Sequence, residues 1–287
     1  MKKTLLLLLA CCTLSIRSFA GGHDNSPIGG RAIGLGNASV TLRDHWAMFN
    51  NIGGIAGIQD KYAGVFMGNR FNSKSFSTIA AGFVMPTPKE GAATLNFQRF
   101  GDGLFNQSNV GLGYGHKIAG VTLGIQLNYM QTSVSEIGSK GVLGVQFGGI
   151  AEITPQLIFG AHIFNVTQAK IADYNNERLP TIMKAGLSYR PFDKLMCNVE
   201  LEKDVDYKAL VKAGLEYEIV KKVRVRTGIN SRNYSNYFGV GVEHSLFNFD
   251  YAATTHTKLG WSHALSLSYK FYQQKTKSTA KPEASHD

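Results

Sequence analysis

The residues that most often carry catalysis are scattered along this chain. The histidines lack the HExxH spacing of zinc hydrolases, no serine stands in a nucleophile elbow, and no Ser/His/Asp set can be assembled from the spacing. The histidines considered are His45, His116, His162, His244, His256 and His263. We therefore expect no catalytic residues, no metal site and no cofactor, and we do not expect an enzyme.

Two smaller signals also lack the context that their chemistry needs. Gly34 and Gly36 are spaced as in a phosphate-binding loop, but no apolar strand precedes them and no acidic residue follows at the spacing of a dinucleotide fold. Cys11 and Cys12 lie near the N-terminus and Cys197 is alone on an apolar face, so no disulfide framework or CxxC metal site is expected. We interpret Cys197 as a small hydrophobic residue.

A set of charged residues after position 180 does follow a pattern. In the segment that begins at Val211, the apolar side chains Val211, Ala213, Leu215 and Tyr217 alternate with polar or small ones. Because successive side chains of a strand point to opposite faces, such a segment has one apolar and one charged face. The charged residues concerned are Glu200, Glu202, Lys212, Glu216, Glu218, Arg224 and Arg226.

The elements that must position these charges repeat one device: about ten alternating residues followed by a short turn. A transmembrane strand needs roughly 9 to 11 residues, whereas a typical soluble strand has about 5 to 6. The segments predict about 14 strands, an even number as bacterial single-chain barrels have. The expected strands are 61–70, 74–85, 91–100, 107–117, 120–132, 140–153, 156–166, 181–191, 194–203, 208–219, 223–232, 235–244, 246–257 and 261–272. We therefore predict an all-β fold, a transmembrane antiparallel β-barrel.

The connections support the same architecture, because short and longer ones alternate as periplasmic turns and external loops do. If 220–222 is a three-residue turn, Ile219 faces Val223. Glu218 then lies opposite Arg224, and Glu216 lies opposite Arg226. The inner face after Pro180 is charged, whereas before it the face is mostly neutral, with residues such as Gly111, Gln126, Asn128 and Gln146. We favour a structural ladder of ion pairs over a substrate site for the charged side.

The chain divides into four parts. Residues 1–20 read as a secretory signal peptide with Lys2 and Lys3, an apolar stretch and a small-x-small cleavage site. A rival interpretation takes Leu8-Leu9-Ala10-Cys11 as a lipoprotein signal, which leaves an unusually short apolar core. Residues 21–60 form a glycine-rich segment that differs from the rest, 61–272 the barrel, and 273–287 a disordered polar tail. The net charge of +10 is scattered without a recognition-helix pattern, so nucleic acid is not an expected partner.

Two stretches resemble the PorV/PorQ family of Bacteroidetes outer-membrane proteins, which are relatives of the FadL fatty-acid channels. The first is Gly30-Arg31-Ala32-Ile33-Gly34-Leu35-Gly36-Asn37-Ala38, followed by Asp44 and by Asn50-Asn51-Ile52-Gly53-Gly54. The second comprises the hairpins from Leu179 to the closing Ser266-Leu267-Ser268-Tyr269-Lys270-Phe271. The chain departs from the family where Asn51-Ile52-Gly53-Gly54 replaces the usual Pro-Ala-Gly. The resemblance implies a 14-stranded barrel with residues 21–60 as an N-terminal plug-like segment tucked into or against its lumen. It marks Arg31, Gly34, Gly36, Asp44, Asn50 and Asn51 as the plug motif.

Three function classes follow. The first is an outer-membrane barrel accessory to type IX protein secretion, as in some members of that family, with secretion-machinery proteins or cargo as partners. The alternative is a FadL-like channel for small hydrophobic molecules, which predicts an apolar pocket between plug and lumen and a gap in the wall. The third is a soluble secreted β-protein. Both barrel hypotheses place the chain in the cell outer membrane, in contact with outer-membrane lipid and lipopolysaccharide.

Overall fold

The computed structural model describes residues 26–170, 178–231 and 235–271. The expected signal peptide 1–20 and polar tail 273–287 lie outside this range. No helix among the described residues is long and apolar enough to cross a membrane.

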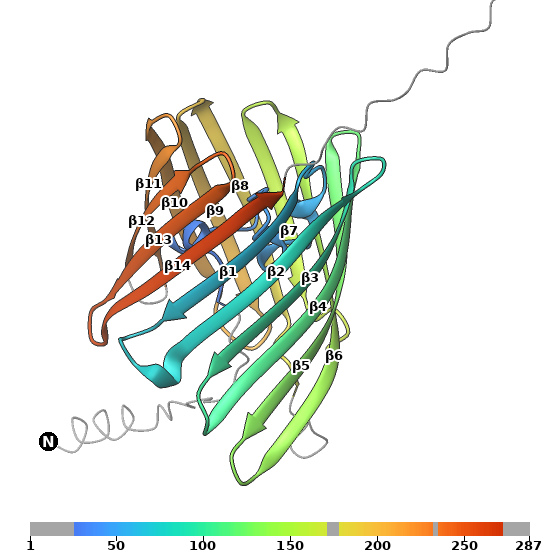
Figure 1. Cartoon of the computed structure of the whole chain (residues 1–287), viewed down its shortest axis with the longest axis vertical. Helices are drawn as coiled ribbons and strands as arrows, with labels where there is room; N and C mark the ends of the chain where they lie inside the picture. Colours follow the sequence, from blue (N-terminus) through green and yellow to red (C-terminus); the bar gives the residue numbers. More distant parts are fainter. Residues whose placement is uncertain (1–25, 171–177, 232–234, 272–287) are drawn as a thin grey trace, which may run out of the picture.

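The described chain forms a closed barrel of 14 strands in which each strand pairs with its sequence neighbours and β1 pairs with β14 (Figure 1). All of the pairings are antiparallel, as in the β1–β14 and β13–β14 ladders. The strands are β1 (Lys61–Asn69), β2 (Ser77–Thr87), β3 (Gly91–Gly101), β4 (Phe105–Ile118), β5 (Val121–Val134), β6 (Gly138–Thr154), β7 (Leu157–Phe164), β8 (Ile182–Phe192), β9 (Leu195–Asp204), β10 (Leu210–Val220), β11 (Val223–Asn230), β12 (Asn236–Glu243), β13 (Phe247–His256) and β14 (Gly260–Phe271). The predicted fold class and strand count are confirmed.

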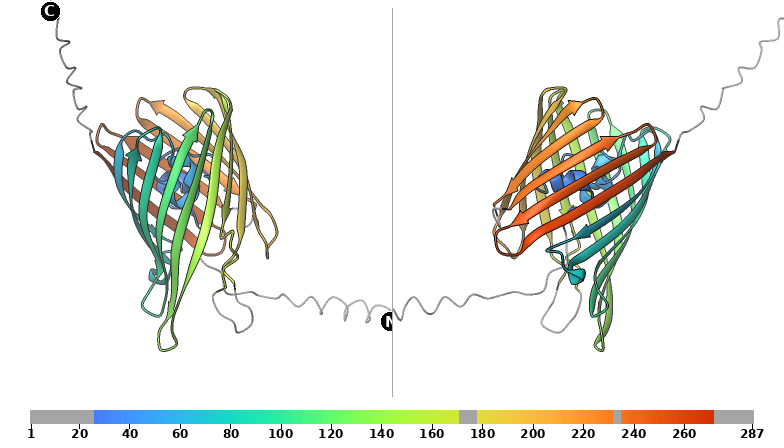
Figure 2. Two further views of the ribbon diagram at one scale, coloured as in Figure 1. Left: turned by 90° about the vertical axis from the view of Figure 1, so that its right-hand side faces the viewer. Right: turned by 60° about the vertical axis from the view of Figure 1, so that its left-hand side comes forward.

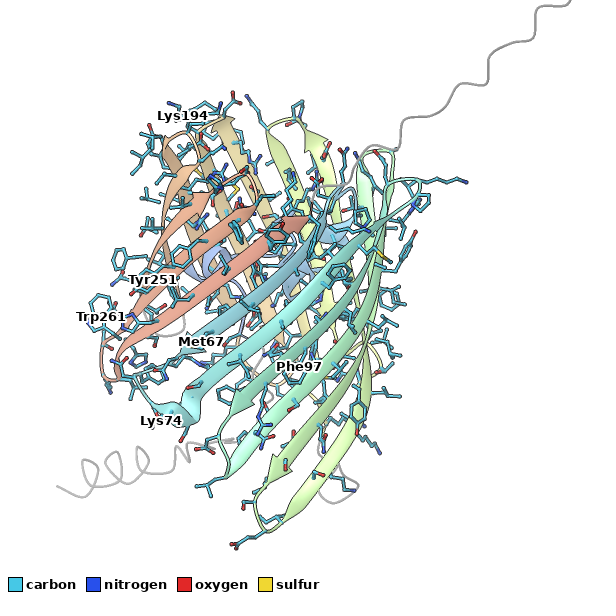
Figure 3. All side chains as sticks on the ribbon, viewed as in Figure 1. Met67, Lys74, Phe97, Lys194, Tyr251 and Trp261 are labelled. Atoms are coloured by element: carbon cyan, nitrogen blue, oxygen red, sulfur yellow. The ribbon has the colours of Figure 1, made fainter. Side chains whose placement is uncertain are left out.

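The alternation of the sequence separates the two faces of the barrel wall. On β9, Val199 is 53% exposed whereas its neighbour Glu200 is 1% exposed. The same holds on β10 for Leu215 and Glu216. Figure 3 shows Trp261 at the margin of the barrel with its side chain directed away from it. The apolar side chains thus cover the outside, and the polar ones fill the lumen, as in transmembrane barrels.

The two ends of the barrel differ in the length of their connections. We call the end with the β2–β3, β4–β5, β6–β7, β8–β9, β10–β11 and β12–β13 turns the short-turn end, and the opposite one the long-loop end. Strands β4 to β6, the longest ones, extend farthest at the long-loop end (Figure 2). The start of β2 departs most from the expected range among the late starts: residues 74–76 form a 3-10 helix, η2 (Lys74–Phe76), and β2 starts at Ser77.

The predicted β10–β11 register is right for the charges and wrong at the turn. Glu216 pairs with Arg226 and Glu218 with Arg224, as expected. However, Val220 rather than Ile219 pairs with Val223, because the ladder shifts between Glu218 and Val220. The tight turn uses a left-handed residue, Lys222 with φ of 72°, and a bulge absorbs the extra residue in the strand.

Residues 26–60 lie inside the barrel and form a plug (Figure 2). It contains α2 (Gly30–Gly34), α3 (Ala47–Asn50) and the 3-10 helix η1 (Ile52–Ile55), joined by turns. These helices are too short to be stable alone, so packing against the wall must hold them. Three buried apolar clusters do this, centred on Trp46, on Met48 with Ile52, and on Leu35 with Met196 of β9.

Glycines on the inner face of the wall make room for the plug. A Cβ added to Gly160 would lie 2.5 Å from the carbonyl oxygen of Val40, and one added to Gly124 would lie 2.7 Å from the carbonyl group of Ile52. Real Cβ atoms do not approach backbone this closely. The glycines whose added Cβ would meet the plug are Gly64, Gly82, Gly113, Gly115, Gly124, Gly148, Gly160, Gly186, Gly214, Gly228 and Gly239. They surround the plug, so we name them the glycine ring.

Candidate functional site

The plug motif residues all lie within the lumen, and each one either bonds within the plug or contacts the wall. Asn50 donates its amide to the carbonyl of Ile28 and accepts from the Ile28 N–H, both at about 3 Å. Asn51 donates to the carbonyls of Val40 and of Gly149 on β6. The amides of these two residues therefore close the plug on itself and tie it to the wall.

The two motif glycines lie at close approaches. A Cβ on Gly34 would be 3.0 Å from the Cα of Gly239 on β12. Gly36 has φ of 68°, a left-handed conformation, and a Cβ there would be 2.7 Å from the backbone nitrogen of Ile229. Both positions require glycine for packing and backbone geometry, not for binding phosphate.

Arg31 links the plug to the charged side of the wall. Its guanidinium donates to both carboxylate oxygens of Glu216, at 2.9 and 2.6 Å, and to Asp44 at 3.1 Å. Glu216 also accepts from Arg226 at 2.6 Å, and Arg226 reaches Asp250 on β13 at 2.6 Å. Burial disfavours the charged form of Arg31, but Glu216 and Asp44 outweigh it and raise the pKa of Arg31 above its ordinary value. This arginine is a permanent cation held by two carboxylates, those of Glu216 and Asp44.

A second ion cluster lies on β8, β9 and β10. Lys212 donates to Glu200 and to Glu202, each at 2.7 Å, and Lys184 lies 3.8 Å from Glu202. The other oxygen of Glu200 accepts the backbone N–H groups of Ser39 and Val40, both at 2.7 Å. Glu200 thus satisfies two buried plug donors and a buried lysine together.

The seven charged residues predicted as one patch separate into three groups. Glu200, Glu202 and Lys212 form the second cluster, and Glu216 with Arg226 joins Arg31. Glu218 and Arg224 form a partly exposed pair at 3.1 Å at the short-turn end, and Arg224 also reaches Glu243 at 2.9 Å. We use the name charged wall for β8 to β13, where these groups lie.

The inner face of β3 to β7, which we name the neutral wall, has a different chemistry. Its buried amides are only partly bonded: Gln126 donates to Asn128 at 2.8 Å, and His162 contacts Gln146 at 3.0 Å. Asn96 Oδ1, Asn109 Oδ1, Gln126 Oε1 and Asn128 Nδ2 have no hydrogen-bond partner among the described residues. Buried polar groups normally have a hydrogen-bond partner. Their unpaired state makes the neutral wall a candidate binding site, in addition to the charged groups.

Two recesses open on the protein surface. An apolar one of about 600 Å³ lies on the outer face of β1 to β4, β13 and β14, where Phe83, Phe97, Phe247 and Leu267 surround Ala63 and Ala81. A polar one of about 370 Å³ lies at the short-turn end between the plug and β11 to β13. The second includes Arg43, which pairs with Glu152, and His45, whose ring stacks on Tyr62 at 5.0 Å.

Within the described residues, no group of three or more His, Cys, Asp or Glu side chains could hold a metal ion. The glycine ring and the unpaired amides were not predicted. The sequence does contain a signal for the glycine ring. Gly186, Gly214 and Gly228 lie at inner-face positions of segments in which apolar and polar side chains alternate. The unpaired state of the amides depends on distances across strands that a sequence does not show.

Comparisons with known proteins identify the fold. No protein-family model and no curated protein matches the chain. Among solved structures, the CymD monoaromatic hydrocarbon channel is similar with a TM-score of 0.70 at 10% identity, over 88% of this chain and 100% of that one. The toluene transporter TodX of P. putida gives 0.64 at 9%, over 88% and 99%. A FadL homologue of Pseudomonas aeruginosa gives 0.62 at 11%, over 85% and 98%. The chain therefore has the fold of FadL-type outer-membrane barrels.

Proposed function

We propose that this protein is an outer-membrane channel for small hydrophobic molecules. The observation that carries the proposal is the apolar recess on the outer wall, because a hydrophobic molecule dissolved in the membrane core would collect there. At its floor the wall is only backbone thick at Gly64 and Gly82, and the plug residues Trp46 and Met48 lie directly behind these glycines. The proteins of similar fold include channels for monoaromatic hydrocarbons and a toluene transporter, which supports the proposal.

The expected gap in the wall is not found at the recess. The β1–β14, β1–β2 and β2–β3 ladders run without interruption past it. Passage at this place therefore requires the plug residues behind Gly64 and Gly82 to move, or these strands to part.

Filling the recess tests the proposal. Ala81→Trp places a large side chain in the recess on the outer face of β2, and Ala185→Trp makes the same change on the outer face of β8, away from the recess. We expect Ala81→Trp to reduce uptake of radiolabelled toluene by cells several-fold and Ala185→Trp to leave it unchanged. Toluene uptake no faster than in cells without the protein would refute the channel.

A second candidate is a PorV/PorQ-type accessory of type IX secretion. The polar recess at the short-turn end favours it, since Asp60, Arg224 and Glu243 offer charges to another protein there. The test is affinity purification of the full chain from native membranes. Co-purification of secretion-machinery proteins, lost when Glu243 is changed to Lys, would support this role. Purification of the barrel without them would count against it.

A further inference from the structure

The neutral wall contains three amide side chains that converge on Gly111 and a fourth two residues away along the same strand face. Asn96 on β3 and Asn128 on β5 both pair with Gly111 of β4 across the ladder. A Cβ on Gly111 would lie 2.7 Å from Asn96 Oδ1 and from Asn128 Oδ1, and would also collide with Gln126. Asn109, two residues from Gly111 on the same inner face, completes the set, which we name the amide cluster.

The amide cluster has unused hydrogen-bonding capacity. Asn96, Gln126 and Asn128 are 1 to 2% exposed and Asn109 is 9% exposed, yet each has one polar atom without a partner among the described residues. An amide carries both a donor and an acceptor end, so the cluster can give and accept bonds whichever way each amide is turned. Leaving such groups buried and unpaired is unfavourable, so a ligand that pairs with them gains affinity.

Apolar groups border the amide cluster on two sides. Toward the plug, Ile52 lies close to Gly113 and Gln126, since a Cβ added to Gly113 would be 2.6 Å from Ile52 Cδ1. The carbonyl of the plug residue Met48 accepts a hydrogen bond from Asn96 at 3.3 Å. Toward the long-loop end, Met130 pairs with Asn109 and belongs to a buried apolar cluster with Phe164, Leu179 and Ile182. The inner faces of β3 and β5 carry no Lys, Arg, Asp or Glu, so a charged ligand would find no compensating charge.

From this geometry we infer that the amide cluster binds the neutral hydrogen-bonding group, a hydroxyl or carbonyl, of a small and otherwise apolar molecule. The inference rests on the proposed channel function and narrows its substrate class. An apolar ring or chain contacts Ile52 and Met130, while the polar group pairs with Asn96, Asn109, Gln126 or Asn128. A pure hydrocarbon would leave these amides unpaired.

The test compares two probes that differ by one group, 4-bromophenol and 4-bromotoluene, in crystals of the full chain. We expect 4-bromophenol to bind with its hydroxyl on Asn96 and Asn128, so that its anomalous bromine peak lies at the far end of the ring, toward Ile52 or Met130. The peak should be weaker or absent for 4-bromotoluene. Asn128→Leu, which keeps the branching at Cγ but removes the hydrogen-bonding groups, should abolish the peak, whereas Asn106→Leu on β4, outside the amide cluster, should not. Ordered water alone at the amide cluster in the 4-bromophenol crystals would overturn the inference.

Uptake by cells separates this inference from the channel itself. We expect the ratio of phenol to toluene uptake to fall about 3- to 10-fold in Asn128→Leu, the range of one neutral hydrogen bond, and to be kept in Asn106→Leu. Toluene uptake with an unchanged ratio would refute the amide cluster as a binding site but leave the channel standing. No protein-dependent uptake of either compound would refute the channel, and the bromine peak would then still decide on the binding site.

Discussion

The charged wall and the neutral wall face the same plug, but they differ in how completely their polar side chains are bonded. On the charged wall, the carboxylates and the basic side chains form ion pairs with one another or with the plug. Glu216 and Glu200 accept hydrogen bonds from the plug directly. The neutral wall also contacts the plug, through the bond from Asn96 to the Met48 carbonyl, the bond from Asn51 to the Gly149 carbonyl and the Arg43–Glu152 pair at the short-turn end. Unlike those groups, several of its amide atoms have no partner among the described residues. Polar groups in a lumen can thus serve to fix a segment or to remain available for a ligand.

The largest expected effect comes from breaking the Arg31 contact. Glu216→Gln keeps the shape of the side chain but leaves Arg31 and Arg226 without their shared carboxylate. Removing one partner of a buried pair costs about 3 to 5 kcal/mol. We expect the free energy of unfolding in urea to fall by this amount, with increased ion conductance through the barrel. Glu136→Gln, at an exposed loop, is the control, and equal stability of the two variants would contradict the role of Glu216.

A smaller loss is expected from the glycine ring. Gly160→Ala introduces a Cβ 2.5 Å from the Val40 carbonyl, so the plug backbone must shift. Overpacking of this kind costs about 1 to 3 kcal/mol. Gly103→Ala is the matched control because nothing lies within 4 Å of its added Cβ. Urea unfolding of both variants measures the difference, and wild-type stability of Gly160→Ala would show that the plug adapts to the wall.

The plug should also respond to pH through His45. Burial lowers the pKa of His45 from its ordinary 6.5, although Asp44 and Asp250 oppose the shift and Arg31 adds to it. The unfolded chain then binds more protons than the folded one, so the contribution of His45 is complete above pH 6.5 and is lost as the pH falls below it. The free energy of unfolding should decline between pH 7 and 5, and less steeply in His45→Gln. Identical slopes would exclude His45 as the cause.

Exchanging Glu218 and Arg224 should have a weaker effect. The pair is partly exposed, and facing opposite charges on neighbouring strands contribute about 0.2 to 1 kcal/mol. The exchange keeps the pair but sets a glutamate against Glu243, so a loss below about 1 kcal/mol is expected. Loss of function in an assembled barrel with this exchange would show that the pair is more than structural.

The smallest effect is expected on the neutral wall. Asn109→Leu replaces an amide that has an unpaired oxygen by an apolar group of similar size, so the lost bonding is slight. Its unfolding free energy should stay within about 1 kcal/mol of the wild type. A loss as large as that of Glu216→Gln would erase the distinction between the two walls.

The alternation of side chains allowed the architecture to be predicted from the sequence, because a period of two is a local property. It located β10 and β11 and placed Glu216 opposite Arg226. It failed at Val220, where the choice between a three-residue turn and a bulge depends on backbone geometry. The division of the charges also escaped prediction, since Arg31 reaches Glu216 from 185 positions away, and only the closed barrel brings them together.

The plug contacts both strands that complete the ring. Trp46 packs behind Gly64 of β1, and the N–H of Gly30 donates to Ser266 of β14 at 3.0 Å. Asp60, just before β1, pairs with Lys270 of β14 at 2.6 Å. If β1 and β14 separated, each would expose an unpaired edge to lipid, where backbone groups have no partner. The plug therefore holds β1 and β14 together, and a barrel that loses its plug should separate first between these two strands.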